Sequence, residues 1–159
     1  MFTDIVRSTS LVEAMGDEAW ADLVQWHDQT LRALFARHDG QEIDHAGDGF
    51  FVVFGDAGVA LHCAEAIQRG LAEHRRNHGF APQVRIGLHA SEARRVGGSF
   101  KGKGVHQAAR IAGEAEGGEI LASRETLEAA GHAAPDSAIR TMSLRGISSP
   151  VEVVTVDWH

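Results

Sequence analysis

The stretch that most constrains the fold is Gln41–Phe54, QEIDHAGDGFFVVF, which reads as a strand, a tight turn and a second strand. Glycine accepts backbone angles that side chains resist, so Gly47 and Gly49 suit a chain reversal around Asp48. Taken alone, this hairpin has two explanations. Asp48 is either a routine turn former or a carboxylate placed for chemistry.

A second acid near the start of the chain favours the chemical explanation. In Met1–Ser8, MFTDIVRS, Asp4 interrupts a short apolar run where a buried strand is expected. Two carboxylates at the ends of neighbouring strands are the usual protein contribution to a pair of divalent cations that handle a phosphate ester. Asp4 comes only three residues into the chain, which indicates a domain excised from, or shortened at the amino terminus of, a longer protein.

Length and charge narrow the class of protein. A chain of 159 residues predicts one domain, spanning 1–159. A net charge of -7 argues against nucleic acid or an anionic membrane as the main partner. Cys63 is the sole cysteine, so we expect a core thiol in a reducing compartment. Without a long apolar run or a leader-like start, we expect a cytoplasmic protein with no membrane contact from this segment.

The remaining pattern predicts a mixed α+β sheet with helices packed on it. The expected helices are Asp17–His38, a second from Gly55-Asp56 to His78, Val105–Glu116, and one capped by Ser123 that runs to about Ala130. The expected strands outside the hairpin are Phe2–Val6, Gln83–Ala90, Glu119–Ala122, Ile139–Leu144 and Val151–Val156. Three residues after the first strand are N-cap candidates: Ser8, Thr9 and Ser10.

A glycine-rich loop with two lysines is expected at Gly97–Gly104, GGSFKGKG, ahead of a helix. Amide N–H groups and the helix dipole favour anions at such a place, but the spacing is not that of a P-loop. A plain loop is the simpler interpretation. The chain shows no zinc-ligand spacing, and neither a Ser-His-Asp arrangement nor a glycosidase-like carboxylate pair explains it better than the metal pair does.

Six motifs stand in one order along the chain: FTDIVRST, GDGFFVVF, VRIGLHASE, the G-x-x-VHQAARI block, GGEILAS and LRGISSPVEVV. Together they resemble the catalytic domain of class III nucleotidyl (adenylate/guanylate) cyclases, from Phe2 to about Val156. The resemblance implies a ferredoxin-like core expanded into the cyclase α+β sandwich, with a mixed, mostly antiparallel sheet. It also implies a head-to-tail homodimer that acts on a nucleoside triphosphate.

The resemblance assigns the metal site. Asp4 and Asp48 match the two metal-binding aspartates of the family, and the carbonyl of Ile5 matches a further ligand. Two Mg²⁺ or Mn²⁺ ions per site would hold the triphosphate and activate the ribose 3'-hydroxyl. Backbone amides at the following strand-to-helix junction, which comprises Val6, Arg7, Ser8 and Thr9, would cradle the terminal phosphates.

Arg110, in AARI, matches the arginine that stabilises the transition state, although a surface charge on a helix is the alternative.

Three positions depart from the family pattern. Asp44 stands where adenine-recognising members usually have lysine, Ser99 where aspartate is frequent, and His106 where asparagine is typical. Aspartate cannot donate a hydrogen bond to adenine N1 but could accept from guanine N1–H and N2, or Asp44 could be a hairpin acid with no base contact. His106 could donate to the ribose or a phosphate.

Two hypotheses therefore compete. The first is an active cyclase that makes a 3',5'-cyclic nucleotide and pyrophosphate at sites shared across a homodimer, with ATP as the default substrate and GTP or a pyrimidine triphosphate as alternatives. The metal ligands would come from one chain; Asp44, Ser99, His106 and Arg110 would come from the other. The second is a degenerate cyclase-homology domain that binds nucleotide or only dimerises and regulates an attached domain.

Overall fold

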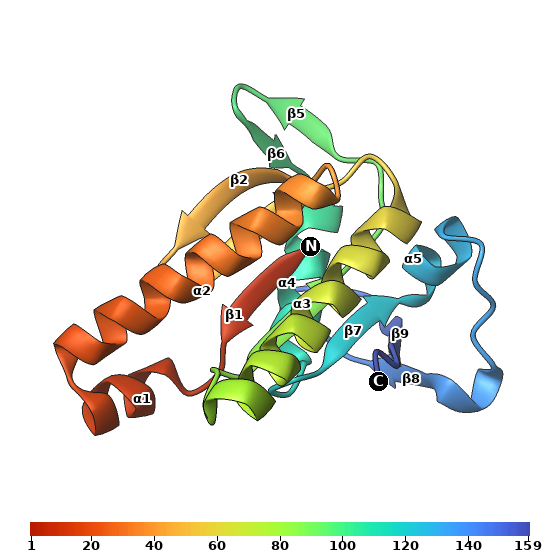
Figure 1. Cartoon of the computed structure of the whole chain (residues 1–159). Helices are drawn as coiled ribbons and strands as arrows, with labels where there is room; N and C mark the ends of the chain where they lie inside the picture. Colours follow the sequence, from red (N-terminus) through yellow and green to blue (C-terminus); the bar gives the residue numbers. More distant parts are fainter.

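The computed structural model describes residues 1–159 and contains a seven-stranded sheet with strand order β2-β3-β1-β4-β7-β9-β8 (Figure 1). Only the β4–β7 pair is parallel, and all the other pairs are antiparallel. The predicted mixed, mostly antiparallel α+β sheet is therefore confirmed. The strands of this sheet are β1 (Phe2–Ile5), β2 (Gln41–Ala46), β3 (Gly49–Val53), β4 (Val84–Leu88), β7 (Ile120–Ser123), β8 (Ile139–Met142) and β9 (Val151–Thr155).

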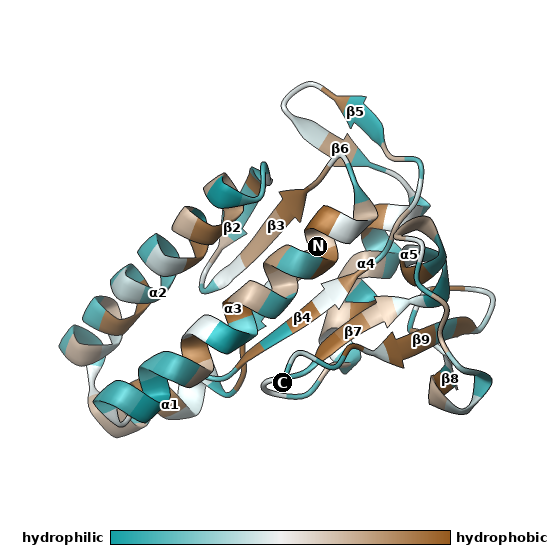
Figure 2. Ribbon diagram, turned by 45° about the vertical axis from the view of Figure 1, so that its right-hand side comes forward, coloured by the Kyte–Doolittle hydropathy of each residue, from teal (hydrophilic) through white to brown (hydrophobic).

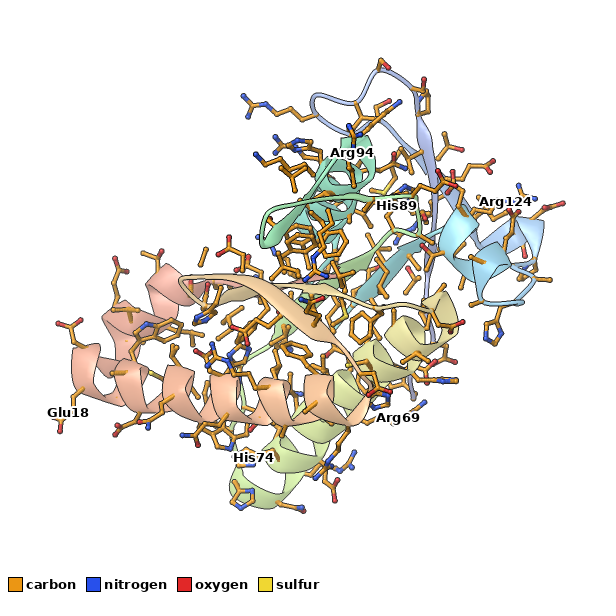
Figure 3. The ribbon with its side chains drawn as sticks, turned by 90° about the horizontal axis from the view of Figure 1, so that it is seen from above. Glu18, Arg69, His74, His89, Arg94 and Arg124 are labelled. Atoms are coloured by element: carbon orange, nitrogen blue, oxygen red, sulfur yellow. The ribbon has the colours of Figure 1, made fainter.

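Helices cover both faces of this sheet. Figure 1 shows α2 and α3 crossing in front of the strands with α4 behind, and Figure 3 separates the same layers from above. None of the helices combines the length and hydrophobicity that a bilayer crossing requires. The helices are α1 (Ser8–Met15), α2 (Asp17–Arg37), α3 (Ala57–His78), α4 (Lys103–Glu114), α5 (Arg124–Ala129) and a 3₁₀ turn at Asp136–Ala138.

The core lies on both sides of the sheet. The larger cluster joins the strands to α2 and α3 through side chains such as Leu31, Phe35 and Ile67, and a smaller cluster includes Ile111 of α4. In Figure 2 hydrophobic colour is concentrated on strands such as β3 and β9, while the last turns of α3 are hydrophilic. The periodicity of the long helices predicted this burial because their apolar residues recur every three or four positions.

Close packing of α4 depends on one glycine. A Cβ atom at Gly87 of β4 would lie 2.2 Å from the backbone nitrogen of Ala112 in α4. Only a residue without a side chain lets the helix approach the strand this closely. Cys63 is buried in α3 as a core thiol, and Ser123 caps α5 by accepting a hydrogen bond from the Thr126 amide, as expected.

Two local predictions are wrong. The cap of α1 is Arg7, in left-handed conformation with φ 55°, and no side chain caps the helix, so Ser8, Thr9 and Ser10 lie inside it. The predicted loop Gly97–Gly104 instead contains a strand. There β5 (Arg94–Val96) and β6 (Ser99–Lys101) form a separate antiparallel hairpin that projects beyond the main sheet (Figure 1). Gly97, with φ 62°, supplies the turn.

Candidate active site

The two acids singled out from the sequence meet at one end of the sheet. Asp4 lies in β1, and Asp48 lies in the turn between β2 and β3, next to Gly47 with φ 62°. A Cβ atom at Gly49 would sit 2.8 Å from the Thr3 carbonyl oxygen and 3.5 Å from Oδ1 of Asp4. Glycine at this position therefore lets the turn approach β1, which brings the two carboxylates together.

The environment of Asp48 disfavours its charge. Burial raises the pKa of Asp48 to about 6, the neighbouring Asp4 carboxylate adds to the rise, and its own backbone amide and the Ser8 hydroxyl oppose it. One oxygen, Oδ2, is buried without a hydrogen-bond partner. Burying a carboxylate oxygen without a partner costs free energy, and Oδ2 has no positively charged partner that would offset this cost.

Arg85 occupies the other side of Asp4, and the sequence analysis missed it. Its Nε and NH2 atoms donate to Oδ2 of Asp4 at 3.0 and 2.6 Å, and its NH1 donates to the Gly113 carbonyl of α4 at 3.1 Å. The two residues are direct partners in the β1–β4 register. A single charged residue inside the apolar strand VRIGL was the signal that could have found it, because a charge in a central strand needs a partner.

Two hollows meet at the acidic pair. Asp48 lines the larger, which we call the α1–α2 groove; it has a volume of about 850 Å³ and also includes Ser8, Thr9, Asp28 and Arg32. Asp4 lines the smaller, the α4-side hollow, with a volume of about 240 Å³; it includes Asp44, Phe51, Arg85, Ala109 and Gly113. The pair of carboxylates thus lies between the groove on the α2 side of the sheet and the hollow on the α4 side.

The strand-to-helix junction after Asp4 offers amides to an anion, but fewer than expected. The Val6 amide already donates to the Gln83 carbonyl at 2.9 Å, so Val6 does not belong to a phosphate cradle. Arg7, Ser8 and Thr9 remain at the uncapped start of α1, where backbone N–H groups point out of the helix. Because Met1 exchanges both backbone hydrogen bonds with Val52, alternation along β1 directs the Ile5 carbonyl toward the hairpin side.

The remaining predicted residues lie away from the pair in a single chain. Ser99 is half-buried in β6, and His106 and Arg110 are exposed on α4. None of the three lines the α1–α2 groove or the α4-side hollow. Asp44 does share the α4-side hollow with Asp4, and its Oδ1 accepts a hydrogen bond from the His45 amide at 2.9 Å.

The arrangement of sheet and helices is that of cyclase catalytic domains. The chain superposes on the guanylyl cyclase Cya2 with a TM-score of 0.82 at 24% identity, covering 97% of this chain and 88% of the other. It superposes on the adenylyl cyclase CyaB from P. aeruginosa with a TM-score of 0.79 at 23% identity, covering 98% and 91%. For the non-canonical dimeric guanylyl cyclase domain of the RhoGC fusion protein from Blastocladiella emersonii, the TM-score is 0.73 at 18% identity, covering 98% of this chain and 92% of the other.

Family membership follows from the sequence match. The model of the adenylate and guanylate cyclase catalytic domain matches residues 1–149, and the chain belongs to this family. A putative adenylate cyclase 3 from Rhizobium meliloti is 31% identical over 103 residues, which are 64% of this chain and 17% of that protein. A serine/threonine-protein kinase, pkn2, from Myxococcus xanthus is 29% identical over 125 residues, 76% of this chain and 15% of the kinase. The chain thus spans about a sixth of these relatives.

Proposed function

We propose that this domain converts a nucleoside triphosphate, with ATP as the first candidate, into the 3',5'-cyclic monophosphate and pyrophosphate. The observation that carries the proposal is the state of Asp48. Its carboxylate is held beside that of Asp4, with one oxygen buried and unpaired and with its pKa raised to about 6. Such a pair is unfavourable by itself and becomes favourable when a cation lies between its members.

The donor set fits Mg²⁺ or Mn²⁺. No cluster of three or more His, Cys, Asp or Glu side chains is available for a metal ion, so the protein offers two carboxylates and the Ile5 carbonyl. Mg²⁺ is commonly bound through one or two carboxylates together with substrate phosphates, which makes this sparse set suitable for a nucleotide-dependent site. When bound, such ions would offset the triphosphate charge and lower the pKa of the ribose 3'-hydroxyl.

The other groups around the pair act on the triphosphate. The amides of Arg7, Ser8 and Thr9 would bind phosphate oxygens at the start of α1, where the helix dipole adds to the attraction. Arg85 directs two donors at Asp4, and a phosphate at the pair would compete for the same guanidinium. These residues would orient the α-phosphorus and hold its charge, which is the main task of a protein in phosphoryl transfer.

A second copy of the chain would complete the site. Ser99, His106 and Arg110 lie outside both hollows of one chain, so the transition-state role proposed for Arg110 requires a partner subunit. The guanylyl cyclase domain of the RhoGC fusion protein from Blastocladiella emersonii forms a non-canonical dimer, which supports the ability of a domain with this fold to dimerise. Asp44 can accept but not donate hydrogen bonds to a base, so GTP is the principal competitor of ATP.

The test is a product assay on the purified domain with Mn²⁺ and ATP, GTP, CTP or UTP in separate reactions. We expect one cyclic nucleotide, formed together with pyrophosphate. Asp48→Ala should abolish turnover, whereas the matched variant Asp157→Ala, at an exposed acid near the carboxyl end, should leave it intact. Normal turnover in the Asp48→Ala protein would refute the metal assignment.

Complementation tests the shared site. Asp48→Ala and Arg110→Ala chains are each expected to be inactive, and mixing them should restore part of the activity because one intact composite site can form. No rescue, with dimers shown by analytical ultracentrifugation, would contradict a site shared between chains.

One observation supports the alternative of a degenerate regulatory domain. Arg85 already neutralises Asp4 through a 2.6 Å contact, so one of the two acids is satisfied without a metal ion. Absence of product with all four nucleotides at a protein concentration that populates the dimer would favour this alternative.

A further inference from the structure

Strand β2 is irregular a few residues before the turn that carries Asp48. Glu42 lies opposite Val52 and Asp44 lies opposite Phe51, so Ile43 is the extra residue of a β-bulge. In a regular strand, residues three positions apart point to opposite faces. Here Glu42 and His45 both contact α2, while Asp44 between them lines the α4-side hollow. The bulge therefore decides which face of the sheet Asp44 reaches.

Four side chains join α2 to this part of β2, and we call them the α2 clamp: Asp28 and Arg32 of the helix, with Glu42 and His45 of the strand. Arg32 donates from Nε and NH2 to the two oxygens of Glu42 at 2.8 and 2.9 Å, which is a bidentate pair. Nε2 of His45 lies 3.1 Å from Oδ2 of Asp28, close enough for an ion-pair contact, although it lacks the alignment of a hydrogen bond. β2 runs alongside α2 in Figure 3.

The helix end of the clamp is itself fixed. Nδ1 of His27, whose side chain is fully buried, lies at hydrogen-bond distance, 3.0 Å, from the other oxygen of Asp28. The Asp28 side chain is only 11% exposed, and each of its two oxygens contacts a histidine ring. The hydrogen bond from Arg32 lowers the pKa of Glu42, which agrees with a formed pair.

The clamp also reaches the second strand of the hairpin. The ring of His45 stacks on Phe50 of β3 with centroids 4.4 Å apart, and the Arg32 guanidinium lies 5.1 Å from the centroid of the same ring. Phe50 is opposite His45 in the register and pairs with Thr3, the neighbour of Asp4. Both strands are thus tied to α2 one residue pair before Ala46 and Gly49, which flank the Gly47-Asp48 turn.

We propose that the α2 clamp is a positioning device for the active site: it holds β2 in its bulged register, which keeps Asp44 in the α4-side hollow and Asp48 beside Asp4. This inference rests on the proposed function. Asp28 and Arg32 act through His45 and Glu42, so they are positioning residues. A shift of one residue in the pairing of β2 with β3 would turn the Asp44 side chain toward α2, so that another residue of β2 would face the α4-side hollow and a bound base. The clamp therefore contributes to metal binding and to base selectivity together.

The test removes the bidentate pair without adding charge to the cluster. Arg32→Gln, Glu42→Gln and the double variant form a mutant cycle, and Asp28→Asn weakens the contacts of Asp28 to His45, His27 and Arg32. The matched control is Arg124→Gln, far from the hairpin on α5. The Arg124 side chain is 41% exposed against 44% for Arg32, and each of the two arginines contacts two carboxylates. Hydrogen exchange of the metal-free protein and Mn²⁺ titration calorimetry are measured first, and the ratio of kcat/KM for ATP and GTP follows.

We expect Arg32→Gln to speed amide exchange in residues 42–48 about tenfold and to weaken Mn²⁺ binding several-fold, while exchange in β4 and β7 stays unchanged. The double variant should be little worse than either single variant, since both remove one pair. The ratio of kcat/KM for ATP to that for GTP should change in Arg32→Gln and in Asp28→Asn. Arg124→Gln should leave all three measurements at wild-type values.

The proposal is overturned if hairpin exchange in Arg32→Gln matches that in Arg124→Gln. It is also overturned if exchange rises while Mn²⁺ affinity and the kcat/KM ratio for ATP and GTP keep their wild-type values. Exchange and Mn²⁺ binding require no turnover, so a wild-type protein without cyclase activity would refute the proposed function and still leave the clamp to be judged by these two measurements.

Discussion

Replacing Asp48 with asparagine is expected to stabilise the metal-free protein while it removes metal binding. The folded-state pKa of Asp48 is raised from 3.8 to about 6, so the unfolded chain loses this proton at a lower pH than the folded one. The stabilising effect of the protonated acid is complete below 3.8 and is lost as the pH rises through about 6. At pH 7.5 the charged Asp48 therefore opposes folding, and the neutral amide of an asparagine side chain at this position does not.

The size of the effect follows from the shift. At 1.36 kcal/mol per pKa unit, the difference between 3.8 and about 6 gives a ceiling of about 3 kcal/mol. Solvent reaches part of the Asp48 side chain and screens its charge, which reduces the expected gain to about 1–2 kcal/mol. For a chain of this size each kcal/mol corresponds to about 2–4 °C in Tm.

The assay is urea and thermal unfolding at pH 7.5 in EDTA and in excess Mn²⁺. Asp48→Asn should be more stable than the wild type in EDTA, and the advantage should shrink as the pH falls below 6. Mn²⁺ should stabilise the wild type more than the variant. The matched control is Asp44→Asn, which removes the same charge from an exposed site on the same hairpin. The reasoning is refuted if Asp48→Asn gives no gain in EDTA, or if Asp44→Asn gives an equal one.

Three further predictions concern buried groups. Burial lowers the pKa of His27, so stability should fall as the pH drops below about 6.5, by at most ~1.4 kcal/mol per pH unit. His27→Asn should flatten this slope in urea titrations between about pH 5.5 and 7.5, and an unchanged slope would exclude His27 as its source. Burial raises the pKa of the Cys63 thiol to about 12, so a disulfide reagent such as DTNB should label the protein only in denaturant, and fast labelling of the native state would contradict this. Gly87→Ala should cost about 1–3 kcal/mol or more because its Cβ would meet the Ala112 backbone, whereas Gly113→Ala, which meets no atom within 4 Å, should not destabilise the protein in the same unfolding experiment.

Local chemistry made much of the fold readable from the sequence. Apolar residues at helical spacing predicted α2 and α3, Ser123 predicted the start of α5, and Gly-Asp-Gly predicted the hairpin. Each of these signals is contained within a few neighbouring residues, because periodicity, capping and turn angles depend on short segments. The prediction failed at Gly97–Gly104, where the glycine content predicted a loop. There Ser99–Lys101 pairs with Arg94–Val96 and forms the β5–β6 hairpin.

The candidate site was predicted in part for the same reason. Asp4 and Asp48 could be named because a carboxylate in a strand or in a glycine turn is visible in the sequence. Their contact depends on the β1–β3 register and on the absence of a side chain at Gly49. Arg85, which lies 81 positions from Asp4, entered the site only through the pairing of β1 with β4.

The sequence by itself thus identified Asp4 and Asp48 as candidate site residues and predicted the long helices and the hairpin, since these follow from residue type and short-range spacing. The tertiary structure alone decided that Val6 is bonded to Gln83, that Arg85 neutralises Asp4, and that a bulge turns Asp44 away from α2. The physical reason is that strand register and side-chain contacts are set by segments far apart in the chain. Which face of a strand a residue occupies changes with a shift of a single position, and a pattern of residue types does not record that shift.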